Sequence, residues 1–465
     1  PHNERITNSP INYIFKTKKP TRIDKTKTMQ RLTETTNSGY KNILQLCLIS
    51  SYGFLGFLFP PLAPPLAWIS IAAKPSLLLA EAKSPRKAIV LPCLFLSAFV
   101  ISETIINLTI SEQPIIDRFL DAQKWIILFI GYIPLSCWLK GDSSRIFMLI
   151  ISSAAGMITG LLIKANPYDI ISFKMHGQDG FLLKPAISSL SSIMTISGII
   201  IFRSRIFKDS TPKRLLTAAL ATISTIYLSS YILAASQYRT AYISLLLSLP
   251  LLVTGRKKIK AAPDRKYGIA MTIAALVMVS YGLKESQDTL IKRIYPDLKT
   301  LSEIFDGHTE RLDLINQSES SLGYRVEALK AGLGAWKEHP LLGWGPLSSE
   351  TMIRESNKPS LKLNSTGKWL VHYHCSYLEI AIRFGAIGLL LISMAATAAW
   401  KAGGTLLDKS NCPNDLKLFI RLGLLMMIPW GATGIYTLPN ATMYIIMFTS
   451  VAATLMRPSI IRQTH

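Results

Sequence analysis

Histidine, tyrosine and acidic side chains gather at residues 372–379, which read His-Tyr-His-Cys-Ser-Tyr-Leu-Glu and open a long apolar run. Histidine is the side chain best able to take up a proton near neutral pH, so His372 or His374 can serve as a general base. Glu379 follows a few residues later, and Arg383 stands at i+4 from it, where the two can pair on one helix face. An ion pair inside an apolar run is costly, which favours a structural or functional reason for it.

Two arginines complete the set of residues that could do chemistry. Arg239 lies in a short Ser-Gln-Tyr-Arg-Thr turn between two apolar runs, and Arg325 lies in the sequence Gly-Tyr-Arg-Val-Glu. A guanidinium group can hold a phosphate through two parallel hydrogen bonds, which a lysine cannot do. Simpler interpretations remain open for both residues: Arg239 as an interfacial anchor, and Arg325 as a partner of Glu327 or a solvated side chain.

Two other kinds of site are disfavoured by the sequence. His372, His374 and Cys375 are close together, and His308 and His339 precede them, but their spacings match no standard zinc pattern. We therefore expect no metal site. The net charge of +23 suggests nucleic acid, yet the basic residues are spread over many loops and no aromatic-studded platform accompanies them. We therefore expect no nucleic-acid partner.

The elements that position these residues must be membrane helices. Of the 465 residues, 49% are hydrophobic and only 17% are charged, and the mean hydropathy is +0.30. Because backbone groups in a bilayer need internal partners, apolar runs of this kind form helices. The sequence predicts an all-α polytopic membrane protein with about twelve spans at 43–59, 65–82, 88–107, 123–139, 146–163, 181–202, 215–235, 240–254, 269–283, 375–399, 418–435 and 439–456. Gly156 and Gly160 form a small-xxx-small pair that favours close helix packing.

Lysine and arginine are concentrated in alternate connections, which fixes the predicted orientation with the N-terminus in the cytoplasm. Arg239, Arg325 and His374 then all fall on the outer side. The predicted organisation is a basic, disordered cytoplasmic segment (1–41), the first nine of about twelve spans (42–283), an outer loop domain (284–372), the remaining spans (373–457) and a cytoplasmic tail (458–465).

The outer loop contains one clear helical pattern. Leu322, Val326, Leu329, Leu333 and Trp336 recur at spacings of four and three, which is typical of one apolar helix face. A proline ends the pattern, and the glycines of the Leu-Leu-Gly-Trp-Gly-Pro segment at residues 341–346 indicate a turn beside the membrane. We expect an amphipathic helix that lies on the outer leaflet.

Taken together, these motifs resemble the O-antigen ligase family. The similarity rests on the Ser-Gln-Tyr-Arg-Thr-Ala turn, a loop arginine before Trp-x-x-His-Pro-Leu-Leu-Gly-Trp-Gly, and His-x-x-Tyr-Leu-Glu at the start of a span with Gly-x-x-Gly-Leu after it. It extends over about residues 43–456 and is strongest at 320–390. The family has Asn after the histidine, where this chain has Cys375.

The resemblance implies a GT-C-like glycosyltransferase in the inner membrane of a Gram-negative bacterium, with its outer loop in the periplasm. It implies an O-antigen ligase that transfers a glycan from undecaprenyl diphosphate to a sugar hydroxyl of lipid A–core, with inversion and without a metal or other cofactor. His374 would be the base, and Arg239 and Arg325 would hold the diphosphate. Tyr324, His372, Tyr377 and Glu379 are expected at the substrate site, where Glu379 can also orient the local network.

Two other functions remain open from the sequence. An O-antigen polymerase of the same superfamily shares the donor chemistry and differs only in the acceptor. A secondary transporter would show interrupted helices and polar groups near the bilayer midplane, whereas most spans here are uniformly apolar. Transport is therefore the weaker alternative.

Overall fold

The computed structural model describes residues 43–59, 86–110, 115–171, 185–207, 212–236, 238–256, 321–346, 348–358, 361–362, 369–402, 414–434 and 439–456, with scattered positions between 273 and 302. The predicted disordered segment 1–41 and the predicted span 65–82 lie outside these residues. The chain divides into a unit of residues 1–47 and a unit of residues 48–465, and the contacts below belong to the second unit.

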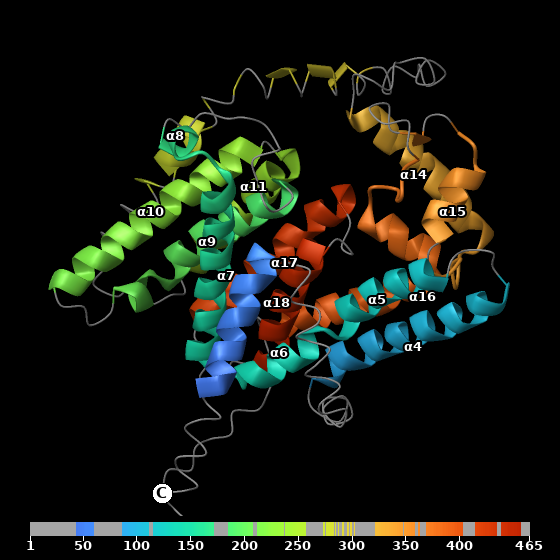
Figure 1. The fold of residues 1–465 in the computed structure, drawn as a ribbon, viewed down its shortest axis with the longest axis horizontal. Helices are drawn as coiled ribbons and strands as arrows, with labels where there is room; N and C mark the ends of the chain where they lie inside the picture. The colour runs from blue at the N-terminus through green and yellow to red at the C-terminus, as the bar shows by residue number, and fades with distance from the viewer. Residues whose placement is uncertain are drawn as a thin grey trace, which may run out of the picture. The chain divides into compact units, whose positions relative to one another are not determined.

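Helices make up the regular structure of the described residues. An unlabelled helix, Ile43–Leu58, comes first. The labelled helices are α4 (Lys87–Ile110), α5 (Ile115–Ile130), α6 (Tyr132–Leu139), α7 (Ser143–Lys164), α8 (Pro167–Ile171), α9 (Pro185–Ile206), α10 (Pro212–Ser236), α11 (Arg239–Arg256), α14 (Ser321–Glu338), α15 (Ser348–Glu355), α16 (Ser376–Ala402), α17 (Asn414–Thr433) and α18 (Pro439–Leu455) (Figure 1). Beyond them, one isolated antiparallel bridge joins Lys362 and Trp369.

Many of these helices are suited to a bilayer. Six are long and apolar enough to cross a membrane, and four shorter apolar helices fall on other predicted spans. For the part of the chain that the structure describes, this confirms the predicted helical, multi-pass membrane protein. The total of about twelve spans and the GT-C-like arrangement stay predictions.

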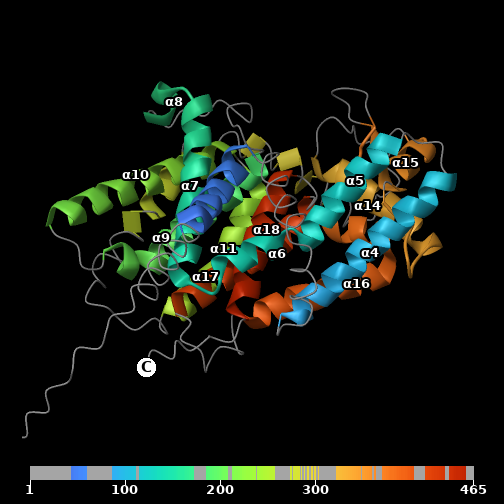
Figure 2. The ribbon, with the colours of Figure 1, turned by 60° about the horizontal axis from the view of Figure 1, so that its bottom comes forward.

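Small residues bring the transmembrane helices close together. A Cβ atom on Gly156 of α7 would collide with the backbone of Phe54 in the first helix, and a Cβ atom on Gly53 would collide with the hydroxyl of Ser152. Gly156 therefore lies at a close helix contact, as the sequence predicts for it. Elsewhere α4 packs on α5 and α16, and α14 and α15 pack on α16 (Figures 1 and 2).

Helix α16 is interrupted at Gly385, where φ is +63° and ψ is −164°. At the break, the turn at 339–346 supplies two backbone donors to α16. The N–H of Trp344 donates to the carbonyl of Ile382 over 2.7 Å, and the N–H of Gly345 donates to that of Arg383 over 2.9 Å. Carbonyl groups freed by the break in the helix are thus hydrogen-bonded by the turn.

The same turn also accepts hydrogen bonds from the second part of α16. The N–H of Ala386 donates to Pro340 over 2.8 Å, and the N–H of Ile387 donates to Leu341 over 3.2 Å. The turn therefore makes backbone hydrogen bonds with both sides of the break, and these bonds hold it against the helix. An irregular backbone within a candidate span is tolerated when it is satisfied in this way.

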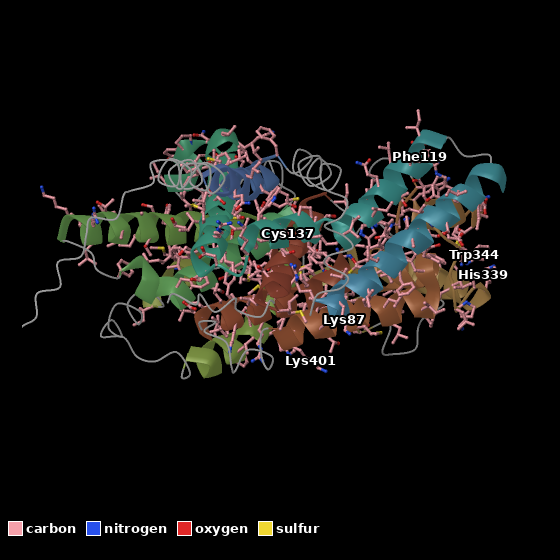
Figure 3. The ribbon with its side chains drawn as sticks, turned by 90° about the horizontal axis from the view of Figure 1, so that it is seen from below. Lys87, Phe119, Cys137, His339, Trp344 and Lys401 are labelled. Carbon is pink, nitrogen blue, oxygen red and sulfur yellow. The ribbon has the colours of Figure 1, made fainter. Side chains whose placement is uncertain are left out.

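Side chains fasten the turn to α14 as well. The indole N–H of Trp344 donates to the carbonyl of Ala335 over 2.8 Å, and the ring of His339 meets that of Trp344 with centroids 3.9 Å apart. Figure 3 shows His339 and Trp344 beside one another, away from Lys401 near the end of α16. The turn therefore fixes α14 relative to the first part of α16.

Candidate functional site

The predicted base lies in a short turn immediately before α16. Here His372 and His374 are half-buried and Tyr373 is buried. The backbone of His374 is left-handed, with φ at +56°. Its N–H donates to Nδ1 of His372 over 3.3 Å, and the two rings meet edge to face with centroids 4.2 Å apart. A left-handed conformation costs a residue with a side chain about 1–3 kcal/mol, so surrounding contacts must hold it.

Glu379 supplies such contacts from the first turn of α16. Its side chain is buried, with only 1% of the residue exposed. One carboxylate oxygen, Oε1, accepts the backbone N–H of Tyr373 over 2.6 Å. The other, Oε2, accepts the hydroxyl of Ser349 over 2.6 Å and Nε of Arg383 over 2.9 Å. With both oxygens engaged by protein groups, the geometry of Glu379 favours the orienting role, and its predicted contact with substrate stays a prediction.

The same carboxylate affects the tyrosine beside it. Burial raises the pKa of the Tyr373 phenol, Glu379 raises this pKa further and Arg383 opposes the change. Tyr373 therefore stays neutral at physiological pH, packed with Leu378 and Ile382 in a small apolar cluster. The turn between the two histidines is thus anchored by one buried side chain and by one backbone hydrogen bond.

Arg383 extends the network to another transmembrane helix. Its pairing with Glu379 confirms the i+4 ion pair that the sequence predicts. It also binds Asp121 of α5, with the atoms Nη1 and Oδ2 2.5 Å apart, and its guanidinium lies 5.4 Å from the centre of the Trp125 ring. Lys124 approaches Asp121 at 3.8 Å and is half exposed. Sequence reasoning missed both Asp121 and Ser349 as members of this network.

Arg239 begins α11, and its position is defined by its neighbours. The side chain of Arg239 lies outside what the structure describes. Beside it, Thr240 shares a hydrogen bond of 2.7 Å with the hydroxyl of Thr433, and the phenol of Tyr238 lies 3.5 Å from the same hydroxyl. The backbone at Arg239 is thus tied to the end of α17.

The end of α17 is tied in turn to the histidine turn. The hydroxyl of Ser376 donates to the carbonyl of Gly434 over 2.7 Å, and the phenol of Tyr377 donates to the carbonyl of Ile428 over 2.9 Å. Ser376 is two residues from His374, and Gly434 directly follows the threonine that binds the start of α11. The structure therefore brings the backbone of the Arg239 turn and the histidine turn to the same end of α17.

Arg325 lies on α14, where its position follows from helix packing. A Cβ atom on Gly332 would lie 2.5 Å from Leu378 of α16, and Ala328 belongs to the same buried cluster as Leu378. Because α14 continues from this contact into the turn at the break in α16, α14 and the first part of α16 run in the same direction. Arg325 then lies about 10 Å back along α14 from the Gly332–Leu378 contact, and His374 lies just before the start of α16, toward the same end.

Helix α14 packs on α16 through small residues. Its buried face consists of Ala328, Gly332 and Ala335, whereas Leu329 and Leu333 of the predicted apolar stripe are 41% and 39% exposed. The middle of the predicted stripe is therefore exposed, whereas Trp336 at its end packs against the buried cluster. The predicted position of this helix on the outer leaflet stays a prediction. The side chain of Tyr324 lies outside the described residues.

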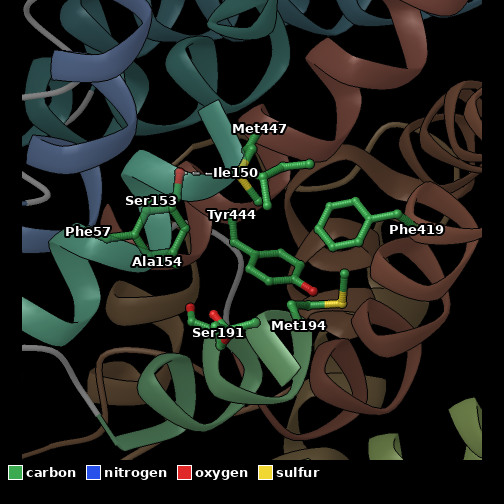
Figure 4. A pocket seen from close by; sticks show the side chains of 10 residues that line it. Phe57, Ile150, Ser153, Ala154, Ser191, Met194, Phe419, Tyr444 and Met447 are labelled. Atoms are coloured by element: carbon green, nitrogen blue, oxygen red, sulfur yellow. Dashed lines mark hydrogen bonds between the residues drawn. The ribbon is translucent and has the colours of Figure 1, made fainter. Parts of the chain in front are cut away.

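Neither a metal-ligand cluster nor a cavity coincides with the histidine turn among the described residues. There, no group of three or more His, Cys, Asp or Glu side chains could hold a metal ion. A cavity of about 30 Å³ lies among the transmembrane helices, lined by Ser191, Phe419 and Tyr444 among others (Figure 4). The predicted site residues do not line it, so it is distinct from the site around His374.

Part of the chain is similar to a known protein family. Residues 220–393 match a family model described as O-antigen ligase, and this segment includes Arg239, Arg325, His374 and Glu379. Asp121 lies outside it. No curated protein matches the chain.

Proposed function

We propose that this protein is an O-antigen ligase, a proposal that the match of residues 220–393 to the O-antigen ligase family model supports. It transfers a glycan from undecaprenyl diphosphate to a sugar hydroxyl of lipid A–core, at the periplasmic face of the inner membrane of a Gram-negative bacterium. The reaction inverts the configuration at the anomeric carbon and uses no metal. The observation that carries the proposal is the shared anchoring of the Arg239 turn and the histidine turn at residues 433–434.

The proposed chemistry is a single displacement. The acceptor oxygen attacks the anomeric carbon while the bond from that carbon to the diphosphate oxygen breaks, and the diphosphate leaves with the bonding electrons. The imidazole of His374 takes the proton of the acceptor hydroxyl, a contribution of about 10²–10⁴ in rate. Arg239 and Arg325 hold the charge that develops on the diphosphate through directional, charge-assisted hydrogen bonds.

The location of the residues supports this assignment of roles. Arg325 and His374 lie at the same end of the α14–α16 pair, so a donor bound there can meet both groups. Glu379 is engaged with protein groups on both oxygens, which leaves the histidines as the better candidates for the base. We assign the role to His374 and a supporting role to His372, whose Nδ1 accepts the His374 N–H.

The proposal is tested by reconstituting the purified protein with donor lipid and lipid A–core. His374→Ala should abolish glycan transfer while leaving expression and membrane insertion intact. His465→Ala is the control, because it removes a histidine from the predicted cytoplasmic tail at 458–465. Transfer at the wild-type rate by the His374→Ala protein would remove His374 from the mechanism.

The polymerase alternative differs only in the acceptor, and the same reconstitution can distinguish it. A ligase should glycosylate lipid A–core, whereas a polymerase should lengthen the lipid-linked glycan when no lipid A–core is present. In cells, loss of a ligase should give rough lipopolysaccharide with lipid-linked O-antigen accumulating. Loss of a polymerase should leave the core capped by a single repeat unit.

A further inference from the structure

A buried chain of charges joins α5 to the histidine turn. Asp121 binds Arg383, Arg383 binds Glu379, and Glu379 accepts the backbone N–H of Tyr373. Asp121, Glu379 and Arg383 are all less than 9% exposed. Burying such charges is costly unless each is well paired, and here every link is a direct hydrogen bond.

This series of contacts ends at the backbone N–H of Tyr373, next to His374, and so influences the direction of the His374 side chain. Glu379 can hold the Tyr373 N–H only while its own side chain keeps one orientation. That orientation is fixed at Oε2 by Arg383 and by Ser349 of α15. Arg383 is fixed in turn by Asp121 from a helix that is remote in sequence. Each link therefore limits the freedom of the next.

From this geometry we infer that Asp121 is a positioning residue, which acts through Arg383 and Glu379 to hold His374 where it can accept the acceptor proton. The inference rests on the proposed function and extends it to α5, outside the segment that matches the family model. Asp121 contacts neither substrate nor the reacting atoms in this role. It secures the left-handed turn that carries the base.

A positioning role affects turnover more than donor binding, because the two proposed diphosphate-binding arginines lie on other elements. Asp121→Asn keeps the size of the side chain and removes its charge, so Arg383 is left with a single carboxylate partner. We expect kcat to fall by roughly 10- to 100-fold, because a small misplacement of a reacting group causes a loss of this size. KM for the donor lipid should stay within about two-fold.

Three variants separate this role from a general loss of folding. Asp117→Asn changes an exposed carboxylate one turn earlier on α5 and should leave kcat unchanged. Asp121→Glu keeps the charge and should recover much of the lost kcat. Ser349→Ala removes only one hydrogen bond to Glu379, so it tests the same series of contacts if Asp121→Asn does not fold. It should lower kcat by a smaller factor and leave KM unchanged.

The outcomes distinguish this inference from the proposed function. If His374→Ala abolishes transfer but folded Asp121→Asn and Ser349→Ala keep the wild-type kcat, the positioning role is wrong and the proposed function stands. Equal changes in kcat and KM, or a loss that Asp121→Glu does not recover, would also overturn the positioning role. If His374→Ala transfers glycan at the wild-type rate, His374 is not the base, and the positioning role that acts through it is wrong as well. If the wild-type protein transfers no glycan to lipid A–core in the reconstitution, the proposed function itself fails.

Discussion

Ser376 donates a hydrogen bond of 2.7 Å to the carbonyl of Gly434, which joins the start of α16 to the end of α17. The neighbouring Thr433 binds Thr240 at the start of α11. Residues that are almost two hundred positions apart in sequence therefore share one anchoring point. A rigid common anchor is what a site made from separate helices needs in order to hold a donor and a base in fixed relation.

The first prediction concerns the geometry of diphosphate binding by Arg325. Arg325→Lys keeps the positive charge but loses the planar pair of donors, so we expect kcat/KM to fall by about ten-fold or more. The measurement is transfer of glycan to lipid A–core by the purified variant. Arg354→Lys is the control, because Arg354 pairs with Glu350 on the exposed side of α15. Full activity of Arg325→Lys would mean that two-point binding is unnecessary.

The second prediction concerns metal removal. If arginines balance the charge of the leaving diphosphate, EDTA should leave the rate of the reconstituted reaction within about two-fold of the untreated rate. Activity lost in EDTA and restored by added Mg²⁺ would show instead that a divalent cation takes part. The assay uses the full chain with purified lipids, so that metal carried by crude membranes does not contribute.

Local sequence signals predicted part of this site well. The i+4 spacing of Glu379 and Arg383 was enough to predict their ion pair, and the glycines at 343 and 345 were enough to predict a turn. Asp121 could not be assigned to the pair, because its contact with Arg383 spans 262 positions and leaves no local pattern. The insertion of the turn into α16 likewise depends on contacts between distant segments.

The packed face of α14 shows a second limit of sequence reasoning. The period of Leu329 and Leu333 identified an apolar stripe, which in a soluble protein would face the core. In this helix the protein contact is made by Ala328 and Gly332, while the leucines stay exposed. Gly332 leaves room for the Leu378 side chain of α16, and an apolar period alone does not reveal a contact of this kind.

The third prediction tests the inserted turn. Gly385 has a φ of +63°, and a Cβ atom there would collide with the backbone of Leu341. We expect Gly385→Ala to destabilise the folded protein by more than about 2 kcal/mol and to release the turn from α16. Gly334→Ala is the matched control: Gly334 is a helical residue of α14 with nothing within 4 Å of an added Cβ, so alanine should stabilise the protein slightly.

Thermal unfolding in detergent measures this effect, with proteolysis of the turn as an independent readout. The Gly385→Ala protein should unfold at a lower temperature and be cleaved faster within residues 339–346. Equal unfolding temperatures for the Gly385→Ala and Gly334→Ala proteins would show that the break in α16 tolerates a side chain.

The fourth prediction concerns alkaline pH and Tyr373. Burial, followed by the charge of Glu379, raises the pKa of this phenol in the folded protein, whereas in the unfolded chain it is about 10. Because the folded pKa is the higher one, the contribution of this group to stability is fully present below pH 10 and is lost as the pH rises through the folded pKa. Tyr373→Phe should therefore show a smaller loss of stability above pH 10 than the wild-type protein. Unfolding measured in detergent from pH 8 to 11 tests this, with the exposed Tyr168→Phe as control; identical slopes for the wild type and Tyr373→Phe would contradict the raised pKa.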